Sequence, residues 1–191
     1  ARLVSVALSK ELGTSVIVEN KPGANATMAG SEVARAKPDG LTLWFAASPT
    51  ITISPNVMTK MPFDPAKDLT AVSPVLSYYN VLVVNNDQPF RTTRELVDYA
   101  KAHPGQLNYA TSGTGSVPHV GVELFKQLNH IDIVHVPYKG AGPAMQDVIA
   151  GNVQMTVATP PSVMGFVQNG KVRALAVAAK QRLPQMPDVP T

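Results

Sequence analysis

Cysteine is absent from the 191 residues, and aromatic residues and charged residues are scarce, at 6% and 15%. The absence of cysteine excludes disulfides, thiol catalysis and cysteine-ligated zinc. No apolar run reaches the length of about 18 residues that a membrane span requires. The lysines and arginines are scattered and no motif combines basic with aromatic residues, so we expect no nucleic-acid partner.

Apolar residues make up 45% of the chain and the net charge is only +3, a composition that favours a folded domain with a sizeable core. The first residues, ARLVSVALSKELG, follow a helical rhythm with Leu3, Ala7 and Leu8 on one face and no N-cap before them. The last residues, PDVPT, stop in mid-connection. We therefore interpret the sequence as a piece of a longer protein.

One pattern recurs along the chain: a helix ends at Gly or Pro-Gly, and a short β-rich run follows. The instances are LGTSVIVEN, KPDGLTLWFAA, HPGQLNYAT, AGNVQMTVAT and NGKVRALAVAA. The runs are continuous, as in strands buried on both faces. Between them the sequence predicts helices over 93–102, 117–128, 143–150 and 161–169. Thr92 and Glu95 have the spacing of a capping box at the start of the first helix. The second helix should pack through one stripe: Val117, Val120, Gly121, Leu124 and Leu128. This order predicts an α/β protein with mostly parallel sheets and flanking helices.

Residues 69–90 read as two strand-like runs with no helix between them, which is typical of a crossing between two lobes. We expect residues 1–90 to form a first, partial lobe and residues 91–180 a second lobe. Residues 181–191 then begin the return to the first lobe.

Ligands of open α/β sheets bind beyond the carboxyl ends of the strands. Those ends give four turns, over residues 46–50, 110–116, 136–142 and 158–162. The turns hold hydroxyls, glycines and prolines, and none holds Asp or Glu. Donor-rich turns without carboxylates indicate an anionic ligand.

The turn 112–116 is the strongest of the four candidates. Its small residues open a helix, whose N-terminal N–H groups and dipole favour an anion. Ser112, Thr114 and Ser116 add hydroxyl donors, and Gly113 and Gly115 permit close approach. The alternative is that Ser116 only caps the helix and the glycines only shape the turn.

Side chains near the turns have two interpretations each. His119 either donates to the ligand or packs in the first helical turn, and Lys139 either pairs with the anion or is solvated. Tyr138 either forms a pocket wall or covers the core. Trp44 is most simply a core residue of a strand. The other histidines, His103, His130 and His135, have no metal-ligand spacing and are interpreted as structural or surface residues.

Catalytic signatures are missing. SGTGSVPH lacks the lysine of a phosphate-binding loop, GTGSVPHVG lacks the third glycine of a dinucleotide fingerprint, and no G-x-S-x-G is present. Ser116 and His119 lie three residues apart, but no acidic residue nearby could orient the histidine. We expect no catalytic residue, no metal and no cofactor.

The chain also resembles a known family. VIVENKPGANATMAG, VARAKPDGLTL, LNYATSGTGSVPHVGVELFK, DIVHVPYKGAGPAMQDVIAG and GKVRALAVAAKQRLPQMPDVPT are similar, in order, to solute-binding proteins of tripartite tricarboxylate transporters, the Bug family. The resemblance implies a two-lobe periplasmic binding protein fold of type II, with lobe one incomplete. It implies a monomeric, non-enzymatic periplasmic protein that captures a small organic carboxylate in an interlobe cleft for membrane components of the transporter.

The family's binding features carry over where the residues match. They suggest ligand contacts from Ala47, Ser48 and Thr50, from Ser112–Ser116 with His119, from the P-Y-K-G turn with Tyr138 and Lys139, and from Thr159. Many relatives end the strand before TPPS with Asp, where this chain has Ala158. With no carboxylate to pair an ammonium group, we predict an organic acid without an amine. The alternative function is an α/β enzyme acting on a small anionic metabolite.

Overall fold

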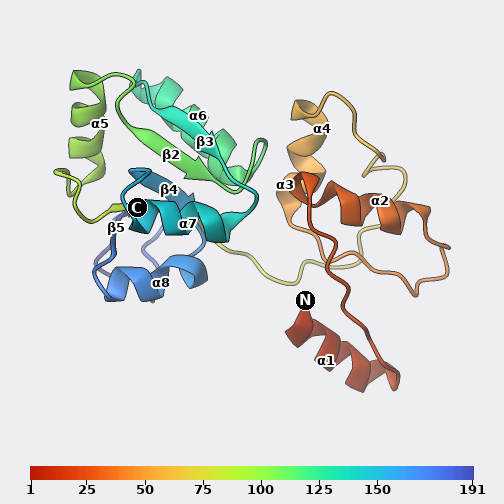
Figure 1. Cartoon of the computed structure of the whole chain (residues 1–191). Helices are drawn as coiled ribbons and strands as arrows, with labels where there is room; N and C mark the ends of the chain where they lie inside the picture. Colours follow the sequence, from red (N-terminus) through yellow and green to blue (C-terminus); the bar gives the residue numbers. More distant parts are fainter. The chain divides into compact units, whose positions relative to one another are not determined.

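A computed structural model describes all residues 1–191 and divides them into two compact units, residues 1–71 and 72–191 (Figure 1). None of the helices combines the length and the hydropathy that crossing a membrane requires.

Unit 1 contains helices and no strand. They are α1 (Arg2–Leu12), the 3₁₀ turn η1 (Ala24–Ala26), α2 (Thr27–Arg35), α3 (Ser48–Thr52) and α4 (Ser54–Val57). The strands expected in LGTSVIVEN and KPDGLTLWFAA are wrong for this structure, because neither segment has a neighbouring strand to pair with. Their apolar side chains, including Ile17, Leu41 and Leu43, are exposed.

The core of unit 1 is small. Phe63 is buried and meets Trp44 edge to face, with ring centroids 5.7 Å apart. Gly30 of α2 lies against both rings, and any side chain there would collide with them. Trp44 is thus a packing residue, as expected, although it does not lie in a strand. The predicted apolar face of α1 has no such partner, since Leu3 is exposed.

Unit 2 is built on one five-stranded sheet in the order β3-β2-β4-β1-β5. The strands are β1 (Val81–Asn85), β2 (Asn108–Thr111), β3 (Val134–Pro137), β4 (Met155–Ala158) and β5 (Val172–Val177). β2 runs parallel to β3 and β4, whereas β1 runs antiparallel to β4 and β5. The α/β class is therefore confirmed, but the sheet is mixed rather than mostly parallel.

Four helices flank this sheet: α5 (Thr93–Ala102), α6 (Val117–Asn129), α7 (Ala141–Ile149) and α8 (Pro160–Gln168). All four predicted helices are present, with ends shifted by at most two residues. The cap of α5 is the predicted one, since Thr92 Oγ1 accepts from the Glu95 N–H at 3.2 Å. Glu95 reaches back to the N–H of Arg91 rather than to that of Thr92.

The sheet is buried on both faces, as the continuous apolar runs predict. One core cluster joins β1 to α7 and α8 through Val83, Val148 and Val163, and the other joins the sheet to α5 and α6 through Leu96 and Val122. The stripe predicted to be the packing face of α6 is wrong. Val120, Leu124 and Leu128 are 36%, 53% and 70% exposed, because α6 turns Val122 and Phe125 inward instead.

The compact units differ from the lobe boundaries expected at residues 90 and 180. Residues 81–85 form β1, a strand inside the sheet of unit 2, so the division falls earlier in the chain. Residues 181–191 also belong to unit 2: Met186 is buried in its core, and the Val177 N–H donates to Pro190 O at 2.8 Å. The lobes of a longer protein stay a prediction.

The directions of the strands determine which strand ends lie at the same edge of the sheet. Val81 at the start of β1 pairs with Ala158 at the end of β4 and with Val177 at the end of β5. Just beyond them, the Ala178 N–H donates to Asn80 O at 2.8 Å. The carboxyl ends of β2, β3 and β4 therefore lie at the same edge as the start of β1.

Candidate functional site

Three of the four predicted turns meet at this edge of unit 2. Thr111 pairs with Pro137, and β2 is also parallel to β4, so the residues that follow these strands leave the sheet side by side. The first helical residue of α6, of α7 and of α8 comes at most six residues after its strand. The fourth turn, residues 46–50, lies in unit 1, where it opens the short helix α3.

The turn after β2 is held by hydrogen bonds within itself. Gly113 N–H donates to Thr111 Oγ1 at 3.2 Å, and Ser116 Oγ donates to Gly113 O at 2.7 Å. Gly113 and Gly115 both have positive φ, at 135° and 79°, which a residue with a side chain adopts only under strain. The glycines therefore shape the turn, whatever it binds.

Ser116 occupies the N-cap position of α6, but its hydroxyl makes no cap bond because it points back to Gly113 O. Ser116 is also buried. Ser112 and Thr114 are exposed, and their hydroxyls make no hydrogen bond within the chain. Of the three hydroxyls in this turn, those two are open to a ligand.

His119 contacts the turn rather than solvent alone. Its Nδ1 accepts a hydrogen bond from the Gly115 N–H at 3.2 Å. That nitrogen is an acceptor, so it cannot donate to an anion. The prediction that His119 contacts a ligand could therefore hold only for its other nitrogen, Nε2.

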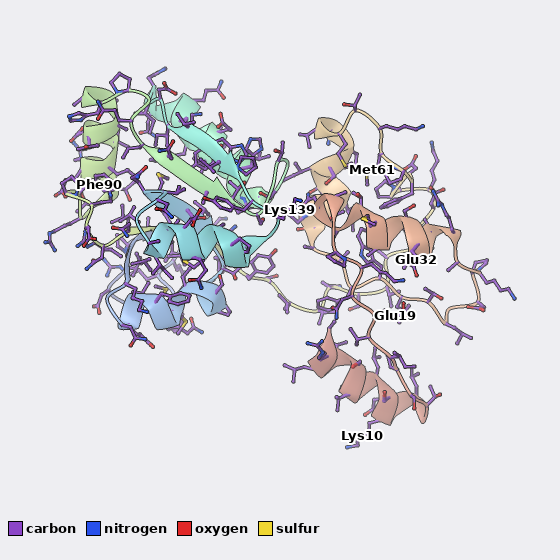
Figure 2. All side chains as sticks on the ribbon, in the orientation of Figure 1. Lys10, Glu19, Glu32, Met61, Phe90 and Lys139 are labelled. Atoms are coloured by element: carbon purple, nitrogen blue, oxygen red, sulfur yellow. The ribbon has the colours of Figure 1, made fainter.

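Tyr138 and Lys139 follow β3. The hydroxyl of Tyr138 donates to Asp147 Oδ2 of α7 at 2.6 Å. Burial, with this hydrogen bond, raises the pKa of Tyr138 to about 12. Its half-buried ring also packs on the α7–α8 core cluster, which supports the core interpretation. Lys139 is exposed and makes no ion pair within the chain (Figure 2).

Thr159 lies directly after β4. It is the N-cap residue of α8, and its Oγ1 lies 3.1 Å from Ser162 Oγ. The acidic groups nearest to these turns in the hydrogen-bond network are occupied: Asp147 binds Tyr138 and Asn152, and Glu123 binds Lys126 and Tyr109. The edge thus presents donors and no free carboxylate. No group of three His, Asp or Glu side chains is arranged to hold a metal ion.

In unit 1, the predicted residues take different positions. Ala47 is the N-cap of α3 and Ser48 is its exposed first residue. Thr50 is buried, and its Oγ1 donates to Asn25 O at 2.9 Å. The hydroxyl of Thr50 is therefore a structural donor in this unit.

The loop that Thr50 holds was not among the predicted site residues. Ala24, Asn25 and Ala26 all have positive φ, at 45°, 52° and 65°, an uncommon and costly run for residues other than glycine. Asn25 Nδ2 donates to the buried Ser54 Oγ at 2.9 Å. The motif KPGANATMAG carries this loop, but nothing in its letters reveals three consecutive left-handed residues.

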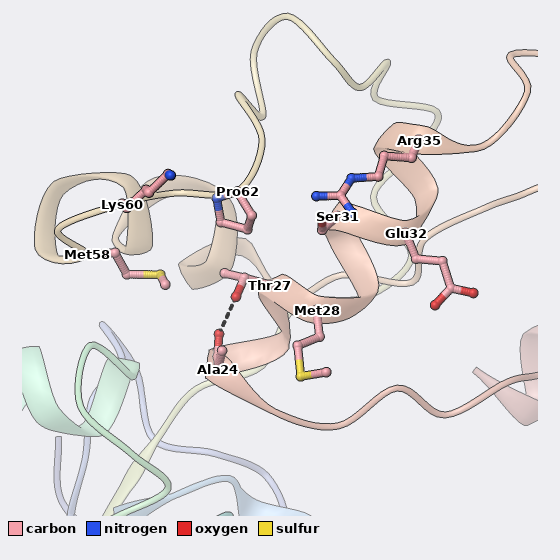
Figure 3. Close-up of a pocket in the computed structure, with 9 residues that line it drawn as sticks. All are labelled: Ala24, Thr27, Met28, Ser31, Glu32, Arg35, Met58, Lys60 and Pro62. Atoms are coloured by element: carbon pink, nitrogen blue, oxygen red, sulfur yellow. Dashed lines mark hydrogen bonds between the residues drawn. The ribbon is translucent and has the colours of Figure 1, made fainter.

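Unit 1 also has an open groove of about 550 Å³ between α2 and the segment after α4 (Figure 3). Met28 and Met58 give it apolar walls, and Arg35 and Lys60 supply two positive charges. The groove contains none of the twelve predicted site residues. It is a separate feature of unit 1.

The fold of unit 2, with turns that follow the carboxyl ends of parallel strands and lead into helices, is that of a periplasmic binding protein. Residues 1–191 match the model of the tripartite tricarboxylate transporter family receptor, and the chain belongs to that family. It is 37% identical over its whole length to the UPF0065 protein in the gbd 5′ region of Cupriavidus necator and 32% identical to protein BugT of Bordetella pertussis. The resemblance stated from the sequence is confirmed.

Solved structures agree. The chain superimposes on R. palustris Rpa4515 with adipate at a TM-score of 0.94 and 33% identity, and on MatC from Rhodopseudomonas palustris with bound malate at 0.90 and 34%. It superimposes on the periplasmic binding protein BugD at 0.90 and 28%. All of this chain is covered in each case, but it spans only 63–65% of those chains and 57–59% of the two relatives above.

Proposed function

We propose that the chain is the greater part of an extracytoplasmic solute-binding protein that captures a small organic carboxylate for a tripartite tricarboxylate-type transporter. It works as a monomer in the periplasm, and membrane components of the transporter are its partners. Relatives with adipate and malate support the substrate class, and BugD supports the compartment. The proposal contains no catalytic step, and no observation favours the enzyme alternative.

The observation that carries the proposal is the chemistry of the sheet edge in unit 2. The turn after β2 offers the open hydroxyls of Ser112 and Thr114 and the N-terminus of α6, and the turn after β3 offers the unpaired cation Lys139. Each hydrogen bond to a charged group is worth about 1.5–3 kcal/mol. We assign one ligand carboxylate to the turn 112–116, with Tyr138, Lys139 and Thr159 beside it. Ala47, Ser48 and Thr50, which the family resemblance suggests as contacts, lie in unit 1 and are not part of this assignment.

The ligand is an acid without an amine. A buried ammonium group is costly unless a carboxylate accompanies it. Residues 110–116, 136–142 and 158–162 contain no Asp or Glu, and the carboxylates of Glu123 on α6 and Asp147 on α7 already have partners. Calorimetry should therefore give tighter binding for adipate, malate or succinate than for aspartate or glutamate. An amino acid that binds better than all three acids contradicts the assignment.

Charge substitutions test the location. Ser112→Asp or Thr114→Asp puts a carboxylate where the ligand's carboxylate is expected, and should weaken binding by at least about tenfold through repulsion. These positions are better than Ser116, because burial of Ser116 makes its own substitution a folding test as well. Gln106→Glu is the matched control: it adds the same charge at an exposed position just before β2, at the opposite edge of the sheet.

The result has two readings. If Ser112→Asp and Gln106→Glu bind the acids equally well, the ligand does not lie at this turn. If only Ser112→Asp and Thr114→Asp lose affinity, with the same unfolding midpoint as the unsubstituted protein, the location holds.

A further inference from the structure

Two histidines lie behind the turn 112–116 and touch its backbone or its hydrogen-bond partner. His119 Nδ1 accepts from the Gly115 N–H, and His135 Nε2 lies 2.7 Å from Thr111 Oγ1, which in turn accepts from the Gly113 N–H. The two imidazole rings face each other with centroids 4.2 Å apart. The Gly115 N–H thus donates directly to a histidine, and the Gly113 N–H donates to a threonine hydroxyl that contacts the other histidine.

The hydroxyl of Thr111 decides which nitrogen of His135 carries a proton. This hydroxyl has one proton, which it donates to Gly113 O at 3.3 Å, and it accepts from the Gly113 N–H. The hydroxyl has no second proton for His135, so its contact with Nε2 is a third hydrogen bond only when Nε2 carries a proton and donates it. The side of His135 that faces the turn is then a donor, whereas the side of His119 that faces the turn is an acceptor.

The histidine pair is fixed from its far side. Tyr109 is fully buried and stacks on His135 at 4.9 Å, and its hydroxyl donates to Glu123 Oε1 at 2.6 Å. Lys126 Nζ donates to the same oxygen at 2.8 Å. The titratable groups around the pair are therefore Tyr109 from β2 and Glu123 with Lys126 from α6. Burial, and next the charge on His119, lowers the pKa of His135.

We propose that His119 and His135 are positioning residues, which hold Gly113 and Gly115 so that the turn presents Ser112 and Thr114 to the ligand. This inference rests on the proposed function. The arrangement requires neutral rings. A proton on His119 Nδ1 would oppose the Gly115 N–H, and two charged rings at 4.2 Å would repel each other. Ligand binding should therefore weaken as the pH falls through the range in which histidine titrates.

Paired substitutions separate the hydrogen bond from the bulk of each ring. His119→Asn keeps an acceptor oxygen at the position of Nδ1, and His119→Phe keeps a ring without an acceptor. His135→Gln keeps a donor near the position of Nε2, and His135→Phe removes it. The probes are adipate and malate, measured by calorimetry at about pH 7.5 and about pH 5.5.

We expect His119→Phe and His135→Phe to weaken binding by about tenfold, and the Asn and Gln variants to stay within about threefold of the unsubstituted protein. The His119→Asn/His135→Gln double variant should lose the pH dependence. The double variant also controls for titration of adipate and malate themselves, because any pH effect on the acids is the same for both proteins. Equal affinity in both Phe variants, or an equal pH dependence in the double variant, overturns the proposal.

A second readout needs no ligand. The exchange rates of the Gly113 and Gly115 amide protons, followed by NMR, should rise in His135→Phe and His119→Phe respectively, and should fall back in the Gln and Asn variants. If neither acid binds the unsubstituted protein at any pH, the proposed function fails, and the amide exchange still decides whether the histidines hold the turn. Unchanged exchange in the Phe variants overturns their role.

Discussion

Asn85 joins β1 to the end of α7, and its replacement tests the packing of unit 2. The side chain is buried; its Nδ2 donates to Val148 O at 2.9 Å and to Ile149 O at 3.2 Å, and its Oδ1 accepts from the Asp87 N–H at 2.9 Å. These carbonyls lie at the end of a helix, where they lack partners within it. Asn85 therefore acts as a C-cap supplied by a strand distant in the sequence.

Asn85→Ala removes all three hydrogen bonds. Each contributes about 1 kcal/mol net, so the expected loss is near 3 kcal/mol. Val148 O keeps a second donor, the Gly151 N–H at 3.2 Å, which lowers the loss to about 2–3 kcal/mol. Urea unfolding followed by far-UV circular dichroism measures it. Asn86→Ala is the control, because Asn86 is exposed and its side chain makes no hydrogen bond.

Asn85→Asp makes the test sharper. Its second oxygen replaces Nδ2 and faces two carbonyl oxygens, so the charged form is disfavoured and the folded-state pKa of the new carboxyl rises above its unfolded value. The folded state then holds the proton over a pH range in which the unfolded state has lost it. The free energy of unfolding of Asn85→Asp, relative to the unsubstituted protein, should fall as the pH rises above about 4. A pH-independent difference, or an Asn85→Ala cost no larger than that of Asn86→Ala, refutes the reasoning.

Two further predictions concern stability. Gly30→Ala would place a methyl 2.8 Å from Trp44 and should cost about 1–3 kcal/mol, read by fluorescence of this sole tryptophan, whereas Gly165→Ala in open space in α8 should be neutral or stabilising by up to about 1 kcal/mol. Equal effects would show that the rings move aside freely. In acid, the lowered pKa of His135 means that the unfolded state takes up a proton first, so unfolding free energy should fall from about pH 6.5 downward. Partial burial alone would raise the pKa of Glu123, but hydrogen bonds from Lys126 and Tyr109 lower it, so its contribution is lost only in a second, more acidic step. In His135→Gln, the free energy of unfolding measured against pH should lose the first step and keep the second. A first step that is unaltered in this variant contradicts the prediction.

The parts of the fold that depend on local chemistry could be predicted from the sequence. Thr92 and Glu95 mark the start of α5, and Ser116 and Pro118 mark the start of α6, because caps and first-turn prolines act within a few residues. The strands of unit 1 could not be judged in this way. A strand forms only against a partner, and the β-rich runs near Val16 and Leu43 have none here.

The site was predictable to the same extent. Strand-end reasoning brings the three turns of unit 2 to one edge, since it needs only the order of strands and helices. It does not find His135, whose role arises from the parallel pairing that sets it beside Tyr109 and near Thr111. The apolar spacing along α6 also indicates the wrong face. It favours Val120 and Leu124, which are exposed, whereas Glu123 lies in a polar network with Tyr109.

The shared edge described for Asn80 and Ala178 has a mechanical consequence. The chain from unit 1 enters the sheet at β1, and β1 and β5 are antiparallel, so the segments before Asn80 and after Ala178 leave the ladder at the same end. Tension between these two segments would first detach residues 179–191, including the bond from the Val177 N–H to Pro190 O. It would then open the ladder one hydrogen bond at a time, beginning with the bond between Ala178 and Asn80 and continuing beside Ala158 and the turns. Strain carried along the polypeptide would therefore disturb the candidate site before it reached the far edge of the sheet.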